Sequence, residues 1–263
     1  MNAVNGGPYK EVHLSRGTIR YREQGAGPPL VFVHGLLVNG DLWRKVVPVL
    51  STPFRCIVPD LPLGSHVVPM ASNADMTPLG LACLMADFLD ALDLQDVTLI
   101  GNDTGGALCQ LVTAHTPALT ALVLTNCDAF ENFYPLALRP LQVGAHIPGF
   151  GNLLGWLLRS RWVQRLVACL VSRRQYTLDE LDTYFGPFVR SPEVRRDTMH
   201  WLQGVSSRYT VEAAERLTTF SRPVLLAWSA DDWLFPLRDA ERLAQVFPDA
   251  RLVQIRGVAC PCA

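Results

Sequence analysis

An aspartate at position 103 lies in a sequence context that would make its carboxylate a nucleophile. Residues 97–106 read VTLIGNDTGG, and a helical pattern follows directly. Asp103 therefore stands at a tight corner between a buried strand and a helix, with Gly101 and Gly105 where the two elements approach closely. A carboxylate there is already ionised and needs no base to attack an electrophilic carbon. An aspartate that only caps the helix is the alternative, but the full strand, corner and helix pattern favours the nucleophile.

Two backbone amides are expected to stabilise negative charge that develops beside this carboxylate. The stretch VFVHGLL ends another buried strand at His34 and Gly35. The loop after that strand and the residue after the nucleophile can each supply one N–H to an oxyanion hole, a pair of donors for an oxygen anion. We predict Leu36 and Thr104 as these donors. We interpret His34 as a buried histidine that holds the loop by hydrogen bonds.

A second carboxylate is expected to support the site. The stretch AWSADDWLFP closes a later strand, and Asp232 stands a few residues before its proline. Asp128 in LTNCDAFENF follows the preceding strand and is the alternative, because neighbouring parallel strands end at the same edge of a sheet. We favour Asp232.

Short strand-like runs alternate with longer helical runs, which is typical of a mostly parallel sheet with helices on both faces. The first two runs alternate apolar and polar residues, whereas the middle runs are continuously apolar, so we expect a sheet that begins antiparallel and becomes parallel. The eight expected strands cover residues 10–15, 18–23, 29–35, 54–60, 96–102, 118–126, 223–229 and 250–255. Helices are expected at 41–50, 77–94, 104–115 and 237–247.

A long helical stretch interrupts this alternation between Asn126 and Pro223. It contains many aromatic residues and no strand-like run, and it is too long for a loop in a compact domain. We therefore predict a core of residues 1–130 and 211–263 with a helical cap at 131–210. The apolar stripe at 141–171 fits a lid over an apolar pocket or packing of the cap onto the core.

Composition argues against several classes of partner. The chain has 263 residues, 49% of them hydrophobic, and a net charge of −1 without a cluster of Lys or Arg. We therefore expect one core and neither a nucleic-acid nor a membrane partner. The seven cysteines are odd in number and unpaired in spacing, which indicates buried thiols in a reducing, cytoplasmic compartment. No secretory signal and no complete set of metal ligands is visible, and we expect no metal and no cofactor.

Together, HG after a buried strand, GNDTGG at the corner and DDWLFP after a later strand resemble the α/β-hydrolase superfamily over nearly the whole chain. The aspartate at the corner is similar to the branch of haloalkane dehalogenases and epoxide hydrolases. The resemblance implies an α/β-hydrolase fold with an eight-stranded sheet and an inserted cap. It also implies a cofactor-independent hydrolase in which Asp103 forms an ester, and a histidine oriented by the acid activates water to hydrolyse it.

The sequence departs from that branch where the leaving group is held. Such dehalogenases usually carry tryptophan directly after the nucleophile and often asparagine after HG, but this chain has Thr104 and Leu36. Epoxide hydrolases usually have proline two residues after HG, where this chain has Leu37, and a pair of cap tyrosines. Candidates for these are Tyr134, Tyr176, Tyr184 and Tyr209. We expect a small, mainly apolar substrate, an epoxide or halide ahead of an ester.

The histidine implied by the resemblance is missing from its place after the last strand. There the sequence reads VQIRGVACPCA, with Cys260 near the expected position, and it stops before the final helix of the fold. A thiol with a pKa of about 8.5 is a poor base for water. His66 could approach the pocket as base, and a structural imidazole is the other interpretation. The second hypothesis is therefore a catalytically impaired or non-catalytic ligand-binding homologue.

Overall fold

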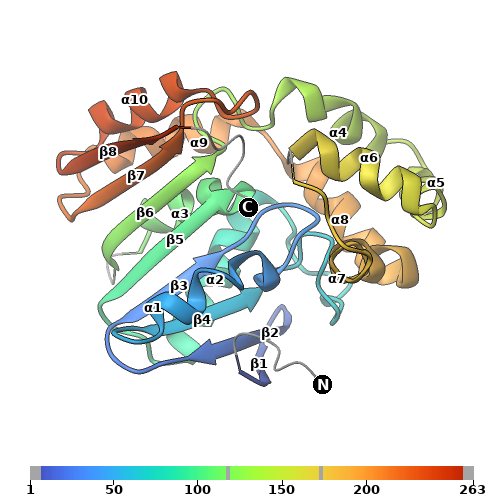
Figure 1. Ribbon diagram of the computed structural model, residues 1–263, viewed down its shortest axis with the longest axis horizontal. Coiled ribbons are helices and arrows are strands. Elements are labelled where there is room, and N and C mark those ends of the chain that lie inside the picture. The colour runs from blue at the N-terminus through green and yellow to red at the C-terminus, as the bar shows by residue number, and fades with distance from the viewer. Residues whose placement is uncertain (1–6, 117–118, 172–173, 257–263) are drawn as a thin grey trace.

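An eight-stranded sheet forms the centre of the molecule, and the computed structural model describes residues 7–116, 119–171 and 174–256 (Figure 1). The strand order is β1-β2-β4-β3-β5-β6-β7-β8. The pairs β1·β2 and β2·β4 are antiparallel, and all other pairs are parallel. The strands are β1 (Tyr9–Leu14), β2 (Gly17–Gln24), β3 (Pro29–Val33), β4 (Arg55–Asp60), β5 (Val97–Asp103), β6 (Leu119–Cys127), β7 (Val224–Ser229) and β8 (Ala250–Ile255). All eight predicted strands and the change from antiparallel to parallel are confirmed.

The two faces of the sheet bury apolar side chains in clusters of different size. Neighbouring residues of a strand point to opposite faces, and Val31 and Phe32 accordingly belong to different clusters. The larger cluster includes side chains from α2 (Pro78–Ala91), α3 (Thr104–Thr113) and α10 (Leu237–Val246). On the other face Phe32 packs against Trp43, with 5.3 Å between ring centroids. Because β3 and β5 are buried on both faces of the sheet, the residues that follow them start from fixed positions.

The helix expected at 41–50 is wrong, because two short helices occupy this segment. They are the 3₁₀ helix η1 (Gly40–Trp43) and the single-turn α1 (Val47–Leu50). Pro48 lies in the first turn of α1 and has no N–H to donate to the carbonyl four residues earlier, so a continuous helix cannot form. Asn39 caps η1 by accepting a hydrogen bond from the Asp41 N–H.

Between β6 and β7 the described residues form helices and turns only. The helices are η2 (Leu136–Leu138), α4 (Arg139–Ala145), α5 (Phe150–Leu157), α6 (Arg161–Val171), α7 (Leu178–Arg190), α8 (Pro192–Gly204) and α9 (Ser207–Leu217). Figure 1 shows α4 to α8 grouped at one end of the molecule, where β5 and β6 point. Helix α9 spans the predicted domain boundary at residue 210 and packs against α3 and α10. In the described ranges no helix has the length and apolar character needed to cross a membrane.

Candidate active site

Asp103 ends β5 and immediately precedes α3. Its backbone is in the left-handed half of conformational space, with φ +54° and ψ −133°, which is a strained geometry for a side chain other than glycine. A methyl group on Gly105 would lie 2.3 Å from the Val33 carbonyl oxygen, so only glycine fits where α3 passes β3. A methyl group on Gly35 would lie 1.9 Å from Asp103 Oδ2. The two glycines therefore let the carboxyl group sit directly against the loop that follows β3.

The Leu36 backbone N–H donates a hydrogen bond to Asp103 Oδ2 over 3.1 Å. Leu37 has φ +55°, and its own N–H donates to the Leu63 carbonyl over 2.8 Å, which fixes the loop. The backbone N–H groups of Leu36 and Thr104 both lower the pKa of Asp103, so both act on its charged form. The structure thus brings the two predicted oxyanion donors to the predicted nucleophile.

Burial is the largest influence on the carboxyl group of Asp103. It raises the pKa from 3.8 to about 7, and the negative charge of Asp232 acts in the same direction against the two N–H groups. Below pH 7 this carboxyl is therefore mainly protonated, and above pH 7 it is mainly a carboxylate. Its readiness to attack a carbon atom depends on pH in the neutral range.

Asp128 lies next to this corner at the end of β6 and is fully buried. Its Oδ2 accepts a hydrogen bond from Thr104 Oγ1 over 3.3 Å, and its Oδ1 has no partner among the described residues. Burial, followed by the charge of Asp103, raises the pKa of Asp128 well above its usual range. The Thr104 hydroxyl donates its hydrogen bond to Asp128, and Thr104 does not line the pocket.

Asp232 approaches the corner from the end of β7. Its Oδ1 accepts hydrogen bonds from the N–H groups of Leu234 (2.9 Å) and Phe235 (3.0 Å). Burial raises its pKa. Its Oδ2 is buried without a hydrogen-bond partner in the described part of the chain. Three carboxyl groups therefore meet at the ends of β5, β6 and β7, as the strand assignments indicated.

Neither histidine discussed in the sequence contacts Asp103. His34 Nε2 accepts from the Leu61 N–H (2.8 Å) and Nδ1 donates to the Gly35 carbonyl (2.8 Å), which requires the neutral Nδ1–H tautomer. Burial lowers the pKa of His34 to about 4, and its interpretation as a loop-holding residue is confirmed. His66 Nε2 lies 3.3 Å from Asp197 Oδ2, and His66 does not line the pocket. Cys260, near the expected place of the base, lies outside the described residues.

A mainly apolar cavity opens above Asp103, with about 680 Å³ of empty space that is partly continuous with solvent. Its wall consists of the loop after β3, Tyr134 and helices of the segment between β6 and β7. The lining residues are Leu36, Leu37, Val38, Asp103, Tyr134, Leu138, Leu141, Val167, Ala168, Leu170, Tyr176, Leu181, Tyr184 and Phe185. A pocket of this kind suits a small molecule with a large apolar part.

Three of the four candidate tyrosines line this cavity, and Tyr209 does not. Tyr134 is buried, and its hydroxyl has no hydrogen-bond partner among the described residues. Burial, then the charges of Asp103 and Asp128, raise the pKa of Tyr134 well above 10, so that the phenol keeps its proton. It is a hydrogen-bond donor beside the candidate nucleophile.

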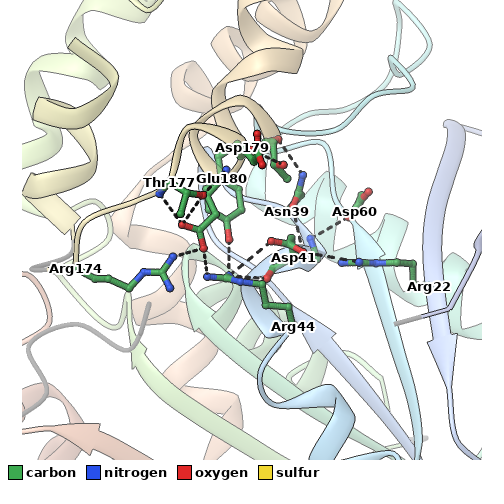
Figure 2. Close-up of polar contacts among 12 residues, drawn as sticks. Arg22, Asn39, Asp41, Arg44, Asp60, Arg174, Thr177, Asp179 and Glu180 are labelled. Atoms are coloured by element: carbon green, nitrogen blue, oxygen red, sulfur yellow. Dashed lines mark hydrogen bonds and ion pairs between the residues drawn. The ribbon is translucent and has the colours of Figure 1, made fainter. Parts of the chain in front are cut away.

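A polar cluster that was not anticipated from the sequence joins the loop after β3 to α7 (Figure 2). Arg44 Nη2 lies 2.5 Å from Glu180 Oε1, and Arg44 Nη1 donates to the Tyr184 hydroxyl over 3.1 Å. Arg174 forms a second ion pair with Glu180. Thr177 and Glu180 form a capping box at the start of α7, and this sequence signal could have located the helix. The cluster fixes the helix that supplies Tyr184 to the cavity wall.

The described residues contain no group of three or more His, Cys, Asp or Glu side chains arranged to hold a metal ion. The three carboxyl groups at the strand ends are held by backbone N–H groups and a hydroxyl.

The profile of the alpha/beta hydrolase fold family matches residues 28–259. A haloalkane dehalogenase of Mesorhizobium japonicum is 29% identical over 197 residues, which are 72% of this chain and 62% of that protein. The chain thus spans less than two thirds of this relative. Haloalkane dehalogenase 2 of Mycobacterium tuberculosis is 26% identical over 246 residues, with 92% of this chain and 84% of the relative covered.

Among solved structures, the haloalkane dehalogenase from Bradyrhizobium elkani superposes with a TM-score of 0.79 at 20% sequence identity. The superposition covers 97% of this chain and 91% of that one. At this level of identity the likeness concerns the fold alone.

Proposed function

The chain belongs to the alpha/beta hydrolase fold family, and from this premise we propose that Asp103 is the nucleophile of a hydrolase acting on a small, mainly apolar electrophile. The observation that carries the proposal is the geometry of the corner. A strained aspartate faces an apolar cavity while the Leu36 N–H donates to its Oδ2. A carboxyl that capped α3 would accept a hydrogen bond from the second or third N–H of that helix, at Gly105 or Gly106, but the Asp103 side chain makes no such cap.

In the first half of the reaction a carboxylate oxygen of Asp103 attacks the electrophilic carbon, and the bond from that carbon to its leaving group breaks. For an epoxide the leaving group is the ring oxygen, which takes a proton and stays on the product as a hydroxyl. The Tyr134 phenol lies beside the nucleophile with an unpartnered O–H and can donate that proton or hydrogen bond. The product is a hydroxyalkyl ester of Asp103.

In the second half water adds to the ester carbonyl carbon, and the bond from that carbon to the alkyl oxygen breaks. The alkyl oxygen takes up a proton and leaves as an alcohol, which is a diol when the substrate was an epoxide. The Leu36 and Thr104 N–H groups are placed to stabilise the negative oxygen that forms on the former carboxyl group. A proton must be removed from water in this step. His34 and His66 are bound to Leu61 and Asp197, so we expect ester hydrolysis to be slower than ester formation.

The lining of the cavity favours an epoxide ahead of a halide. A halide leaving group needs donors that hold an anion, and the positions beside the nucleophile carry an apolar Leu36 and a Thr104 whose hydroxyl serves Asp128. Tyr134, whose buried hydroxyl has no partner among the described residues, instead lies in the cavity wall, together with Tyr176 and Tyr184. Because two relatives are named haloalkane dehalogenases, bromoalkanes are the second class of substrate to test.

Intact-protein mass spectrometry tests this proposal after incubation of the full chain with styrene oxide or bromohexane at pH 8. We expect a covalent adduct with the whole mass of the epoxide on the parent protein and none on Asp103→Asn. A bromoalkane adduct would lack the halogen, which distinguishes the two classes. Absence of both adduct and diol at saturating epoxide, with apolar ligands still bound, would contradict the nucleophile and support the non-catalytic binding hypothesis.

Tyr134→Phe separates the role of the phenol from that of the carboxylate. We expect about a hundredfold slower adduct formation with styrene oxide and little change with bromohexane, because a halide ion leaves without a proton. An equal loss with both compounds would indicate that Tyr134 only shapes the cavity.

A further inference from the structure

The sequence of the inserted helices has a charge imbalance that the net charge of the whole chain conceals. Between Glu131 and Asp179 it contains no aspartate and no glutamate. The same stretch contains six arginines, namely Arg139, Arg159, Arg161, Arg165, Arg173 and Arg174. The remainder of the chain is correspondingly acidic, since the total is −1. The expectation of no membrane partner rested on that total, which averages over two oppositely charged regions.

Helix α6 is apolar on two sides. Its inner side supplies Val167 and Ala168 to the cavity wall. Trp162 and Leu166 on its outer side are exposed, with 72% and 51% of their surfaces accessible. Their spacing, continued by Leu170, is that of one helical stripe. Packing onto the core accounts for the inner side only, and Trp162 and Leu166 present more than half of their surfaces to solvent.

The turn between α5 and α6 extends this exposed apolar surface and adds charge to it. The Arg159 and Ser160 N–H groups donate to the carbonyls of Trp156 and Leu157, which makes the connection tight. Trp156 is 63% exposed, and Leu157 is also exposed. We call the six side chains at this corner the arginine–tryptophan face: Trp156, Leu157, Arg159, Trp162, Arg165 and Leu166. Figure 1 shows α5 and α6 at the outer end of the molecule.

The charges on this face decide between the possible partners. In a symmetric dimer the same patch meets itself, so two arginines of one copy would be brought against a patch that itself carries two arginines and no carboxylate. Both side chains are exposed and form no ion pair among the described residues. An anionic bilayer surface satisfies both halves of the face, since arginine binds lipid phosphates while Trp and Leu side chains enter the boundary of the acyl chains.

We propose that the arginine–tryptophan face binds the surface of an anionic lipid bilayer. Arg159 and Arg165 would lie among the headgroups, and Trp156, Trp162 and Leu166 would enter the interface. Leu170 is both 45% exposed and part of the cavity wall, so the docked face would bring the edge of the cavity close to the lipid. The binding itself does not depend on the nucleophile.

Flotation of the full chain with vesicles tests the proposal. Vesicles of phosphatidylcholine alone are compared with vesicles of equal parts phosphatidylcholine and phosphatidylglycerol, at low and at high salt. We expect binding to the anionic vesicles that weakens with salt, and about tenfold weaker binding for the double variant Arg159→Gln and Arg165→Gln. A comparable loss is expected for Trp162→Ala with Leu166→Ala.

Matched double variants elsewhere on the surface serve as controls. Arg222→Gln with Arg251→Gln removes two exposed arginines near the N-terminal ends of β7 and β8, and Val46→Ala with Val49→Ala removes two exposed apolar side chains at α1. We expect both to bind vesicles like the parent chain. Thermal unfolding of each variant checks that the fold is kept.

The proposal is overturned if the full chain fails to float with anionic vesicles, or if the control variants lose as much binding as those on the face. A dimer in analytical ultracentrifugation that Trp162→Ala with Leu166→Ala abolishes, without vesicle binding by the parent, would assign the face to a second copy instead. Adduct formation by Asp103 is measured in solution without lipid. The outcome of the vesicle experiment therefore does not affect the test of Asp103 as the nucleophile.

Discussion

Ionisable side chains are buried at the corner of Asp103 but exposed around the turn between α5 and α6. At the corner three carboxyl groups meet in the protein interior, and burial raises the pKa of each. Arg159 in the turn and Arg165 in the following helix α6 are exposed, where water solvates their charge at little cost. The interior charges require a rigid scaffold of close contacts because ionised groups are costly to bury. The surface charges require none, and that turn can therefore serve as an interaction surface without loss of stability.

The two regions should differ most when a methyl group is added to a glycine in each. Gly105→Ala would place a methyl group 2.3 Å and 2.5 Å from the Val33 and His34 carbonyl oxygens, and we expect it to lower the free energy of unfolding by about 3–5 kcal/mol. Gly149→Ala, before α5, meets no atom within 4 Å and should cost about 1 kcal/mol for its positive φ. Urea unfolding measures both. Similar losses would mean that the corner is not tightly packed.

Removal of the buried charge at the corner should increase stability, whereas removal of an exposed charge should change it little. Asp103→Asn keeps the size of the side chain and its acceptor for the Leu36 N–H, so we expect about 2 kcal/mol of added stability at pH 8 with loss of adduct formation. The control is Asp182→Asn, an exposed carboxyl on α7 that should change stability by less than about 0.5 kcal/mol. A destabilised Asp103→Asn protein would show that the carboxylate contributes to the fold.

The pH dependence follows from the pKa of about 7 for Asp103. The rate of adduct formation should rise with pH and reach its half-maximal value near pH 7. Stability should change in the opposite sense, because the unfolded carboxyl loses its proton near pH 3.8 and the folded one near pH 7. This contribution therefore declines between about pH 4 and pH 7 and is constant above. Asp232→Asn removes a charge that raises this pKa and should move the midpoint below 7; an unchanged midpoint would assign the titration to another group.

The smallest effect is expected for the ion pairs that Glu180 forms at the start of α7, outside both regions. Glu180→Gln weakens its ion pairs with Arg44 and Arg174 at the start of α7, and we expect about 1 kcal/mol of lost stability with faster hydrogen exchange in α7. Asp182→Asn, also on α7, breaks exposed pairs with Arg161 of α6 and Arg190 of α7 and serves as control. Equal exchange in both variants would mean that the polar cluster does not hold the cavity wall.

The sequence by itself determined the order and type of the strands and the position of the corner. These follow from local information, since alternating or continuous apolar runs report which faces of a strand are buried. The pattern around Asp103 predicted the site in the same way. When a buried strand is followed by a residue with nearby glycines and then by a helix, that residue must lie at a tight corner between the two elements. The helix expected at 41–50 failed for a local reason as well, in that Pro48 outweighed the helical spacing.

Only the tertiary structure decided which side chains meet. It placed His66 on Asp197 instead of in the cavity, selected Tyr134, Tyr176 and Tyr184 over Tyr209 for the cavity wall, and paired Arg44 with Glu180. It also showed which apolar residues of α6 face the cavity and which face solvent, a difference that the apolar pattern of the sequence does not reveal. The physical reason is that burial and pairing depend on residues far apart along the chain. A pattern can predict an apolar stripe, but only the folded structure shows whether a protein surface covers it.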